Sequence, residues 1–231
     1  MKFSVGYLSF ALAFTLVACG DDDASATRPL EESSSSVAPL SSSSAVQSSS
    51  SETISVVDPA SVIKGNFSDS RDGKTYKTVV IGSQLWMAEN LNFETAYSYC
   101  HEEKVSNCEK YGRYYTWNAA LEACPSGWHL PTWVEFDVLI SAVGGAEVAG
   151  NMLKSASGWY NDGNGSDSYG FSILPAGEQS GGEGRLAHFW SSTEFSDVYA
   201  SYMSFSSDKS YVSVYNNSKE ERKYVRCVKD E

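Results

Sequence analysis

The chain has 231 residues, a formal net charge of −12 at pH 7 and 13% aromatic residues. Residues 65–231 carry 22 acidic and 14 basic side chains, so nucleic acid, which requires a basic surface, is a poor partner. A segment of about 165 residues can bury one sizeable core but is too short for two ordinary domains. We therefore expect one globular domain behind the N-terminal region.

The N-terminus has the pattern of a lipoprotein signal peptide. Lys2 is followed by an uncharged, mostly apolar segment, residues 3–17, and then by Ala18-Cys19. This segment is shorter than the roughly 20 residues that cross a bilayer, and small residues before the cysteine suit a signal peptidase. We expect residues 1–18 to be removed and Cys19 to carry lipid such as palmitate, which would anchor the protein in a membrane. An uncleaved membrane anchor is the alternative.

Residues 19–63 have the composition of a disordered tether. Twelve of the nineteen residues from Ser33 to Ser51 are serine, which cannot form a core. A flexible chain of about 45 residues has a root-mean-square reach of roughly 35 to 40 Å. The acidic run Asp21-Asp22-Asp23 resembles an export address of some didermal bacteria, which would place the protein in the outer membrane facing the cell exterior. The alternative is a solvated spacer.

Residues 64–231 form the predicted domain. The sequence of its first half predicts a β-hairpin followed by a helix. Residues 76–81 and 84–87 have the composition of β-strands joined at Gly82-Ser83. Apolar residues recur at helical spacing within residues 114–123, so we expect a short amphipathic helix that ends at Cys124.

A capping box marks the start of a second helix. Thr132 and Glu135 fit the Ser/Thr-x-x-Glu pattern, in which two backbone donors are satisfied reciprocally. One apolar stripe follows, and Gly144-Gly145 supplies the positive φ that ends a helix. The stripe consists of Phe136, Leu139, Ile140 and Val143.

The second half of the domain predicts a long loop region and an antiparallel C-terminal sheet. Residues 158–188 are rich in glycine, asparagine, aspartate and serine. Residues 198–205, 211–215 and 224–228 alternate as strands do, with turn residues at 206–208 and 216–218. The sequence therefore predicts an α+β fold.

Four cysteines remain in the domain: Cys100, Cys108, Cys124 and Cys227. An even number in an exported chain predicts two disulfides, and the residues alone leave three pairings open. A metal site is not expected from them, because no Cys-x-x-Cys spacing occurs and the three histidines lie in separate segments.

Seven segments, taken in order, resemble the Fibrobacter succinogenes major paralogous domain. They are Asp69–Tyr76, Trp86–Leu91, Gly112–Trp117, Ala123–Pro131, Gly170–Gly177, Phe189–Glu194 and Val225–Asp230. The resemblance covers nearly all of residues 65–230. It implies a surface or secreted module with no established activity.

A more distant resemblance is to the C-type lectin-like fold. Thr116-Trp117, Ala120 and Cys124, followed by Gly127–Leu130, fit the first helix and turn of that fold, and Cys227 fits its last strand. The resemblance implies that Cys124 pairs with Cys227, which leaves Cys100 for Cys108. It also implies ligand sites in the long loop region, although the calcium motifs of lectins are absent.

Candidate chemistry in the loop region is sparse. The oxygen ligands Asp162, Asn164, Ser166 and Asp167 could wrap Ca²⁺, and an Asx-rich turn is the alternative. No hydrolase signature or P-loop occurs. The related formylglycine-generating fold uses cysteine chemistry, but the predicted disulfides leave no thiol for it. We therefore expect no cofactor and no catalysis.

Aromatic residues are numerous in the loop region and late strands, and they could stack on sugar rings or belong to the core. We select Trp159 and Tyr160 first, because they lie at the mouth of the loop region, and then Tyr202 and Tyr211. The predicted function is a non-catalytic binding or adhesion module for plant cell-wall polysaccharide. The alternatives are a protein-binding assembly component of the cell surface and a divergent formylglycine-generating-type enzyme.

Overall fold

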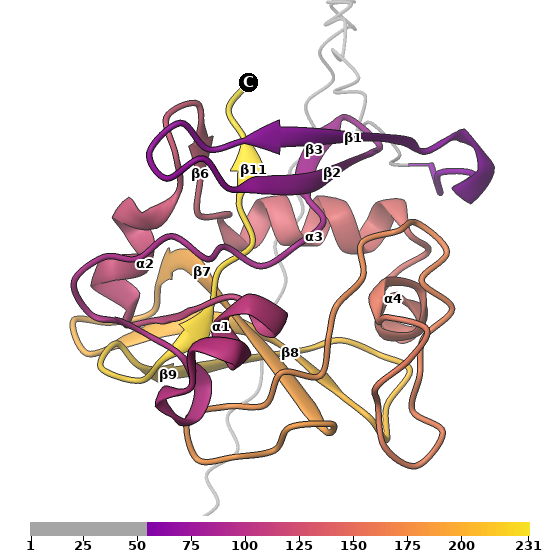
Figure 1. Ribbon diagram of the computed structural model, residues 1–231. Helices are drawn as coiled ribbons and strands as arrows, with labels where there is room; N and C mark the ends of the chain where they lie inside the picture. Colours follow the sequence, from indigo (N-terminus) through magenta and orange to yellow (C-terminus); the bar gives the residue numbers. More distant parts are fainter. Residues whose placement is uncertain (1–54) are drawn as a thin grey trace, which may run out of the picture. The chain divides into compact units, whose positions relative to one another are not determined.

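Two β-sheets and four α-helices make up residues 55–231, the part of the chain that the computed structural model describes (Figure 1). The prediction of an α+β fold is confirmed. The predictions for residues 1–54, which include the signal peptide, the lipidation of Cys19 and most of the tether, lie outside the described residues.

The smaller sheet has the strand order β1-β2-β3-β11-β6, and all neighbouring strands are antiparallel. The predicted hairpin is confirmed as β2 and β3, whereas β1 was not predicted because nearly all of its side chains are exposed and no alternation is visible. The strands are β1 (Ile63–Ser68), β2 (Thr75–Ile81), β3 (Gln84–Met87), β6 (Trp128–His129) and β11 (Val228–Lys229).

The larger sheet has the order β4-β5-β10-β7-β8-β9, in which only β10 and β7 are parallel neighbours. Its strands are β4 (Ser98–Tyr99), β5 (Tyr114–Tyr115), β7 (Leu186–Glu194), β8 (Tyr199–Ser206), β9 (Ser213–Ser218) and β10 (Lys223–Tyr224).

Two details of the predicted C-terminal sheet are wrong. Residues 216–218, predicted as a turn, belong to β9, where Ser201 and Asn216 face each other and their side chains lie 2.9 Å apart. The strand predicted at 224–228 is divided between the two sheets, because β10 pairs in the larger one and β11 in the smaller one.

The α-helices are α1 (Val105–Tyr111), α2 (Trp117–Ala123), α3 (Trp133–Ala142) and α4 (Ala146–Leu153), and short 3-10 turns cover Pro59–Ser61 and His101–Glu103. Helix α2 is shorter than predicted because Tyr114 and Tyr115 pair as β5. Helix α3 begins at the predicted capping box, in which Thr132 and Glu135 satisfy each other's backbone N–H groups.

Helix α4 was not predicted. Gly145, with φ 93°, ends the turn after α3 and is also the residue before α4. Within α4 the backbone of Ser210 approaches Gly150 so closely that a Cβ there would lie 2.4 Å from the Ser210 carbonyl oxygen. Gly145, predicted from the sequence as the end of one helix, is therefore also the N-cap of the next helix, α4.

The predicted loop region ends earlier than expected, because β7 begins at Leu186. Five consecutive residues of β7 are buried, so the strand lacks the alternation that would reveal it. Phe189 belongs to one apolar core, with Phe136 of α3, whereas Trp190 belongs to a second core, with Trp117 of α2. Because apolar cores cover both faces of β7, its sequence does not alternate between apolar and polar residues as that of a half-exposed strand does.

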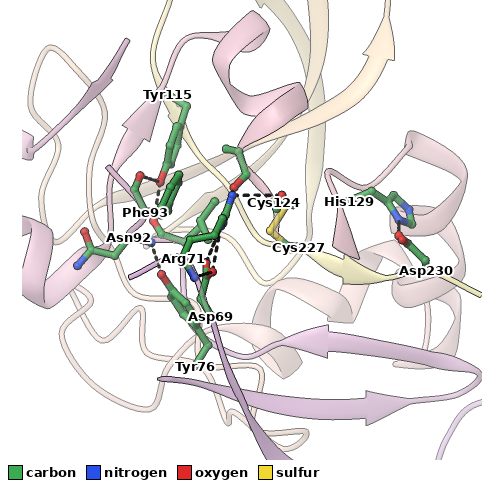
Figure 2. The surroundings of a disulfide bond; sticks show 12 residues. Asp69, Arg71, Tyr76, Asn92, Phe93, Tyr115, Cys124, His129, Cys227 and Asp230 are labelled. Carbon is green, nitrogen blue, oxygen red and sulfur yellow. Dashed lines mark hydrogen bonds and ion pairs between the residues drawn. A yellow bond between two sulfur atoms is a disulfide. The ribbon is translucent and has the colours of Figure 1, made fainter. Parts of the chain in front are cut away.

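Both predicted disulfides are present: Cys100 with Cys108 and Cys124 with Cys227. Figure 2 shows Arg71 beside the second bridge. Its guanidinium pairs with Asp69 at 2.7 Å and donates to the Ala123 carbonyl at 2.9 Å. The β1–β2 connection is thereby attached to the end of α2.

The chain before the predicted boundary at Lys64 also contacts the domain. Val57 packs against the core, and its N–H donates to the Ala142 carbonyl at 2.8 Å. Within residues 55–231 no single helix has the length and apolar composition to cross a membrane. Together α3 and α4 would meet both conditions, but they are bent by 83°.

Candidate functional site

The first predicted ligand-binding residue, Trp159, lies in the core. Its side chain is only 5% exposed, and the indole N–H donates to the Ile173 carbonyl at 3.2 Å and to Ser155 Oγ at 3.1 Å. The ring is therefore not available to a ligand, and the expected exposure of Trp159 is wrong. Its neighbour Tyr160 is exposed and lies near the guanidinium of Arg185.

The oxygen atoms considered for calcium are bonded within the loop. Asn164 Oδ1 accepts from the Trp159 N–H at 3.0 Å, and the Asp167 carboxylate accepts from the Ser172 N–H and hydroxyl at 2.7 and 2.6 Å. Asp162 is exposed. Residues 55–231 contain no group of three or more His, Cys, Asp or Glu side chains that could hold a metal. These residues shape the loop, and we assign no metal to them.

Tyr202, another predicted candidate, lies in a row of aromatic rings on the larger sheet. It pairs with Tyr215 across β8 and β9, and the two ring centroids are 5.8 Å apart. On its other side the Trp190 ring lies 6.2 Å away. Trp190 is buried, Tyr202 is half-buried and Tyr215 is 46% exposed, so the row runs from the core to the surface. Tyr211, the remaining candidate, is exposed beside Lys209 before β9.

A lysine lies against this row. Lys223 of β10 is only 2% exposed, and its Nζ lies 4.1 Å from the Tyr202 ring centroid and 4.8 Å from that of Trp190. Burial lowers the pKa of Lys223 to about 8. Among the described residues it has no ion pair and no hydrogen-bond acceptor, so the ring faces and the more distant charges of Glu221 and Glu178 offset its desolvation only in part. We call Trp190, Tyr202, Tyr215 and Lys223 the tyrosine face.

His188 of β7 adjoins the tyrosine face. Its ring lies 5.1 Å from that of Tyr202, and burial, together with the nearby charge of Lys223, lowers its pKa to about 4. The imidazole is therefore neutral at pH 7. Its buried Nδ1 has no hydrogen-bond partner among the described residues, and Glu178 Oε2 lies 3.5 Å from it.

A polar cleft of about 390 Å³ opens beside Lys223. The segment 178–180 forms one wall, and the connection from β9 to β10 forms the other. Arg222 lies with its guanidinium 3.4 Å from the Tyr99 ring centroid. The cleft is lined by Glu178, Gln179, Ser180, Asn217, Glu221, Arg222 and Lys223.

A second cleft, of about 350 Å³, lies between β2, residues 88–92 after β3, and α1, and has the buried Arg226 in its wall. Arg226 donates to the Phe171 carbonyl and, through Nε and Nη2, to Asn90 Oδ1 at 3.1 and 2.6 Å. Its donors are thus largely satisfied by the protein, which indicates a structural role. Lys223 has no such partners, and we therefore choose the tyrosine face and its polar cleft as the candidate site.

Sequence reasoning selected Tyr202 but missed Lys223 and His188. Lys223 lies in a charged segment, Glu220–Lys223, that reads as a solvated turn, and only its neighbours from β7 and β8 bury it. The one local indication that Lys223 could be buried was its position directly before the strand-like residues 224–228.

The comparisons with known proteins identify the family of the domain but no function. No curated protein and no solved structure matches the chain, so the lectin-like relation stays a hypothesis. A family model described as the Fibrobacter succinogenes major domain matches residues 79–229, which include both disulfides and the whole tyrosine face. The chain therefore belongs to the Fibrobacter succinogenes major domain family.

Proposed function

We propose that this protein is a non-catalytic binding module that a lipid on Cys19 anchors in the outer membrane, facing the cell exterior, and that its ligand is a polysaccharide of the plant cell wall. The observation that carries the proposal is the contact between the Tyr202 and Tyr215 rings beside a polar cleft. Aromatic faces can stack on the C–H surface of sugar rings, and amide and carboxylate groups can bind the hydroxyl groups.

The cysteines favour binding over catalysis. Cys100, Cys108, Cys124 and Cys227 are all in disulfides, so the oxidation chemistry of the formylglycine-generating fold has no thiol to use among them. A protein partner at the cell surface is the second candidate, because exposed tyrosines also occur in protein interfaces.

The test compares two tyrosines of equal exposure on the same strand pair. Tyr215 and Tyr199 are 46% and 47% exposed, and strand alternation places them on opposite faces of the sheet. We expect Tyr215→Ala to weaken pull-down on insoluble polysaccharide about tenfold, since one lost stacking contact is worth about 1 to 1.5 kcal/mol. Tyr199→Ala should bind like the wild type.

The outcome is decisive in either direction. If the wild-type protein retains none of cellulose, xylan and pectin, the carbohydrate ligand is rejected and the protein partner becomes the better proposal. If both variants lose binding equally, the ligand does not use the tyrosine face.

The anchor has its own test. Radiolabelled fatty acid should enter the wild-type protein and should be absent from Cys19→Ala, because the predicted lipidation requires that thiol. Equal labelling of both proteins, or a mature protein that still begins at Met1, would reject lipidation at Cys19.

A further inference from the structure

Lys223 has donors that the described part of the protein does not use. Its side chain is almost fully buried, and its ammonium group lies against the rings of Tyr202 and Trp190 without a hydrogen bond or an ion pair to the described residues. A buried cation without an anionic partner or a hydrogen-bond acceptor is costly. Because Lys223 also lines the polar cleft, a ligand group that enters the cleft can supply the missing acceptor.

The neighbouring carboxylates do not fill this role. Glu178 directs one oxygen towards His188 Nδ1, 3.5 Å away, and it forms no ion pair with Lys223 within 4 Å. Glu221 is exposed at the rim of the cleft. Arg222, the other cation of the lining, lies on the Tyr99 ring. Lys223 is thus the buried positive charge that faces the cleft.

We propose that Lys223 binds the carboxylate of a uronic-acid residue in the polysaccharide while the sugar ring lies on Tyr202 and Tyr215. This inference rests on the proposed function and narrows its ligand to an acidic polysaccharide. Lys223 Nζ is 4.1 Å from the Tyr202 ring centroid, and the Tyr215 ring is 5.8 Å further along the row. The lysine and the two tyrosine rings therefore lie close enough together to contact one or two sugar residues. A uronic acid needs both kinds of contact, because it carries a carboxylate and a ring with a C–H face.

The acidic character of the whole domain does not oppose this contact strongly. The net charge of −8 on residues 65–231 acts at long range and is screened over about 8 Å at physiological ionic strength. Lys223 acts at contact distance from a buried position, where screening is weak.

The experiment measures the affinity of the full-length protein, purified in detergent, for one oligosaccharide in two forms. Oligogalacturonide with free carboxylates is compared at pH 7 with its fully methyl-esterified form, which has the same rings but no charge. The wild type should prefer the acid form about tenfold or more, which corresponds to one charge-assisted hydrogen bond. Lys223→Met should abolish the preference while leaving the affinity for the ester. Lys77→Met, which removes an exposed charge from β2, should keep it.

A pH series on the wild-type protein gives a second readout that does not depend on how a variant folds. The affinity for the acid form should be constant around neutral pH, where the carboxylate is charged. It should fall as the pH rises through the pKa of Lys223 in the free protein, about 8, because the lysine must then take up a proton to bind the carboxylate. Lys223→Arg, which stays charged, should show no fall.

The possible failures are distinguishable. If the wild type binds both forms equally and Tyr215→Ala weakens both, the role of Lys223 is rejected and the proposed function stands. If neither form nor any other polysaccharide is bound, both are rejected. An affinity for the acid form that is unchanged up to pH 10 also contradicts the role of Lys223.

Discussion

Buried cations are handled in different ways within this domain. Lys154 donates to the Ser206 and Lys209 carbonyls at 3.0 and 2.9 Å, and Arg226 donates to Phe171 and Asn90. These side chains connect loops to strands and use their donors in doing so. Lys223 lies against aromatic rings and donates no hydrogen bond to the described residues, and this contrast is the reason for proposing it as a ligand-binding residue.

His188 makes the stability of the domain pH-dependent. Its pKa is near 6.5 in the unfolded chain and about 4 in the fold, so the unfolded state binds more protons between these values. The contribution of the neutral imidazole to the free energy of unfolding is fully present above pH 6.5. It is lost as the pH falls towards 4, and the loss is up to about 3 kcal/mol. Urea unfolding at pH 7 and pH 4.5 should show the loss, and His188→Asn should reduce it.

His129 has the opposite sign and provides the control. Burial lowers its pKa, but hydrogen bonds to Asp230 and Glu135 outweigh burial and raise it above the usual value. Its contribution is therefore fully present below pH 6.5 and is lost as the pH rises through the raised pKa. His129→Asn should steepen the loss of stability on acidification. A flatter profile in this variant would contradict the assignment for His129.

Arg71 should contribute more to the free energy of unfolding than its position near the surface suggests. It pairs with Asp69, whose side chain is fully buried, so Arg71→Ala leaves a buried carboxylate without its cation. We expect a loss of about 2 to 3 kcal/mol in the free energy of unfolding. The exposed pair of Lys104 and Glu102 is the comparison, and Lys104→Ala should leave the free energy of unfolding nearly unchanged.

A double variant tests the explanation for Arg71. If the unpaired charge causes the loss, Asp69→Ala with Arg71→Ala should be no less stable than Arg71→Ala alone. Additive losses would mean that the contacts of Arg71 with the Ala123 carbonyl and the Phe93 ring carry its contribution.

At the scale of elements, the two disulfides should contribute unequally. The Cys124–Cys227 bridge spans 103 residues and the Cys100–Cys108 bridge spans 8, so chain entropy predicts about 4 to 5 kcal/mol for the first and about 2 to 3 kcal/mol for the second. Denaturant unfolding of the two double-alanine variants measures the difference. Equal losses would show that native packing, rather than loop length, sets the contribution.

Elements with a local signal could be predicted from the sequence, and those defined by their surroundings could not. The capping box places the start of α3 because Thr132 and Glu135 interact within one turn. Strand β7 has no such signal, since cores cover both of its faces. The strand predicted at 224–228 has the right composition but changes sheets after Tyr224, which only the tertiary pairing determines.

The candidate site shows the same limit. Tyr202 could be selected because aromatic residues are numerous in the late strands, although the sequence does not show which of them belong to the core. Trp159 was misjudged because its neighbours are glycine, asparagine and aspartate, a composition typical of solvent-exposed loops, although Lys154 and Ile173 enclose the ring. The burial of Lys223 depends on residues 20 to 35 positions away in the chain and leaves no local pattern.

At the scale of the whole domain, the last residues join the two sheets. Strand β10 lies between β5 and β7 in the larger sheet, and β11 lies between β3 and β6 in the smaller one. Neither sheet is complete without the C-terminus, so we expect residues 55–231 to unfold in one cooperative transition. Far-ultraviolet circular dichroism and tryptophan fluorescence should give coincident urea curves, because Trp86 and Trp190 report on different sheets. Two separate midpoints would contradict this coupling.

The interior position of the C-terminal strands also has a consequence for biosynthesis. A nascent chain emerges from the ribosome N-terminus first, but here neither sheet can close until residues 223–229 have emerged. Cys124 is synthesised 103 positions before its partner, while Cys100 and Cys108 are already present, so it waits as a thiol that can form the wrong bond. The Cys124–Cys227 bridge can therefore form only after Cys227 has been synthesised, and we expect a disulfide isomerase to raise the yield of the correctly paired domain.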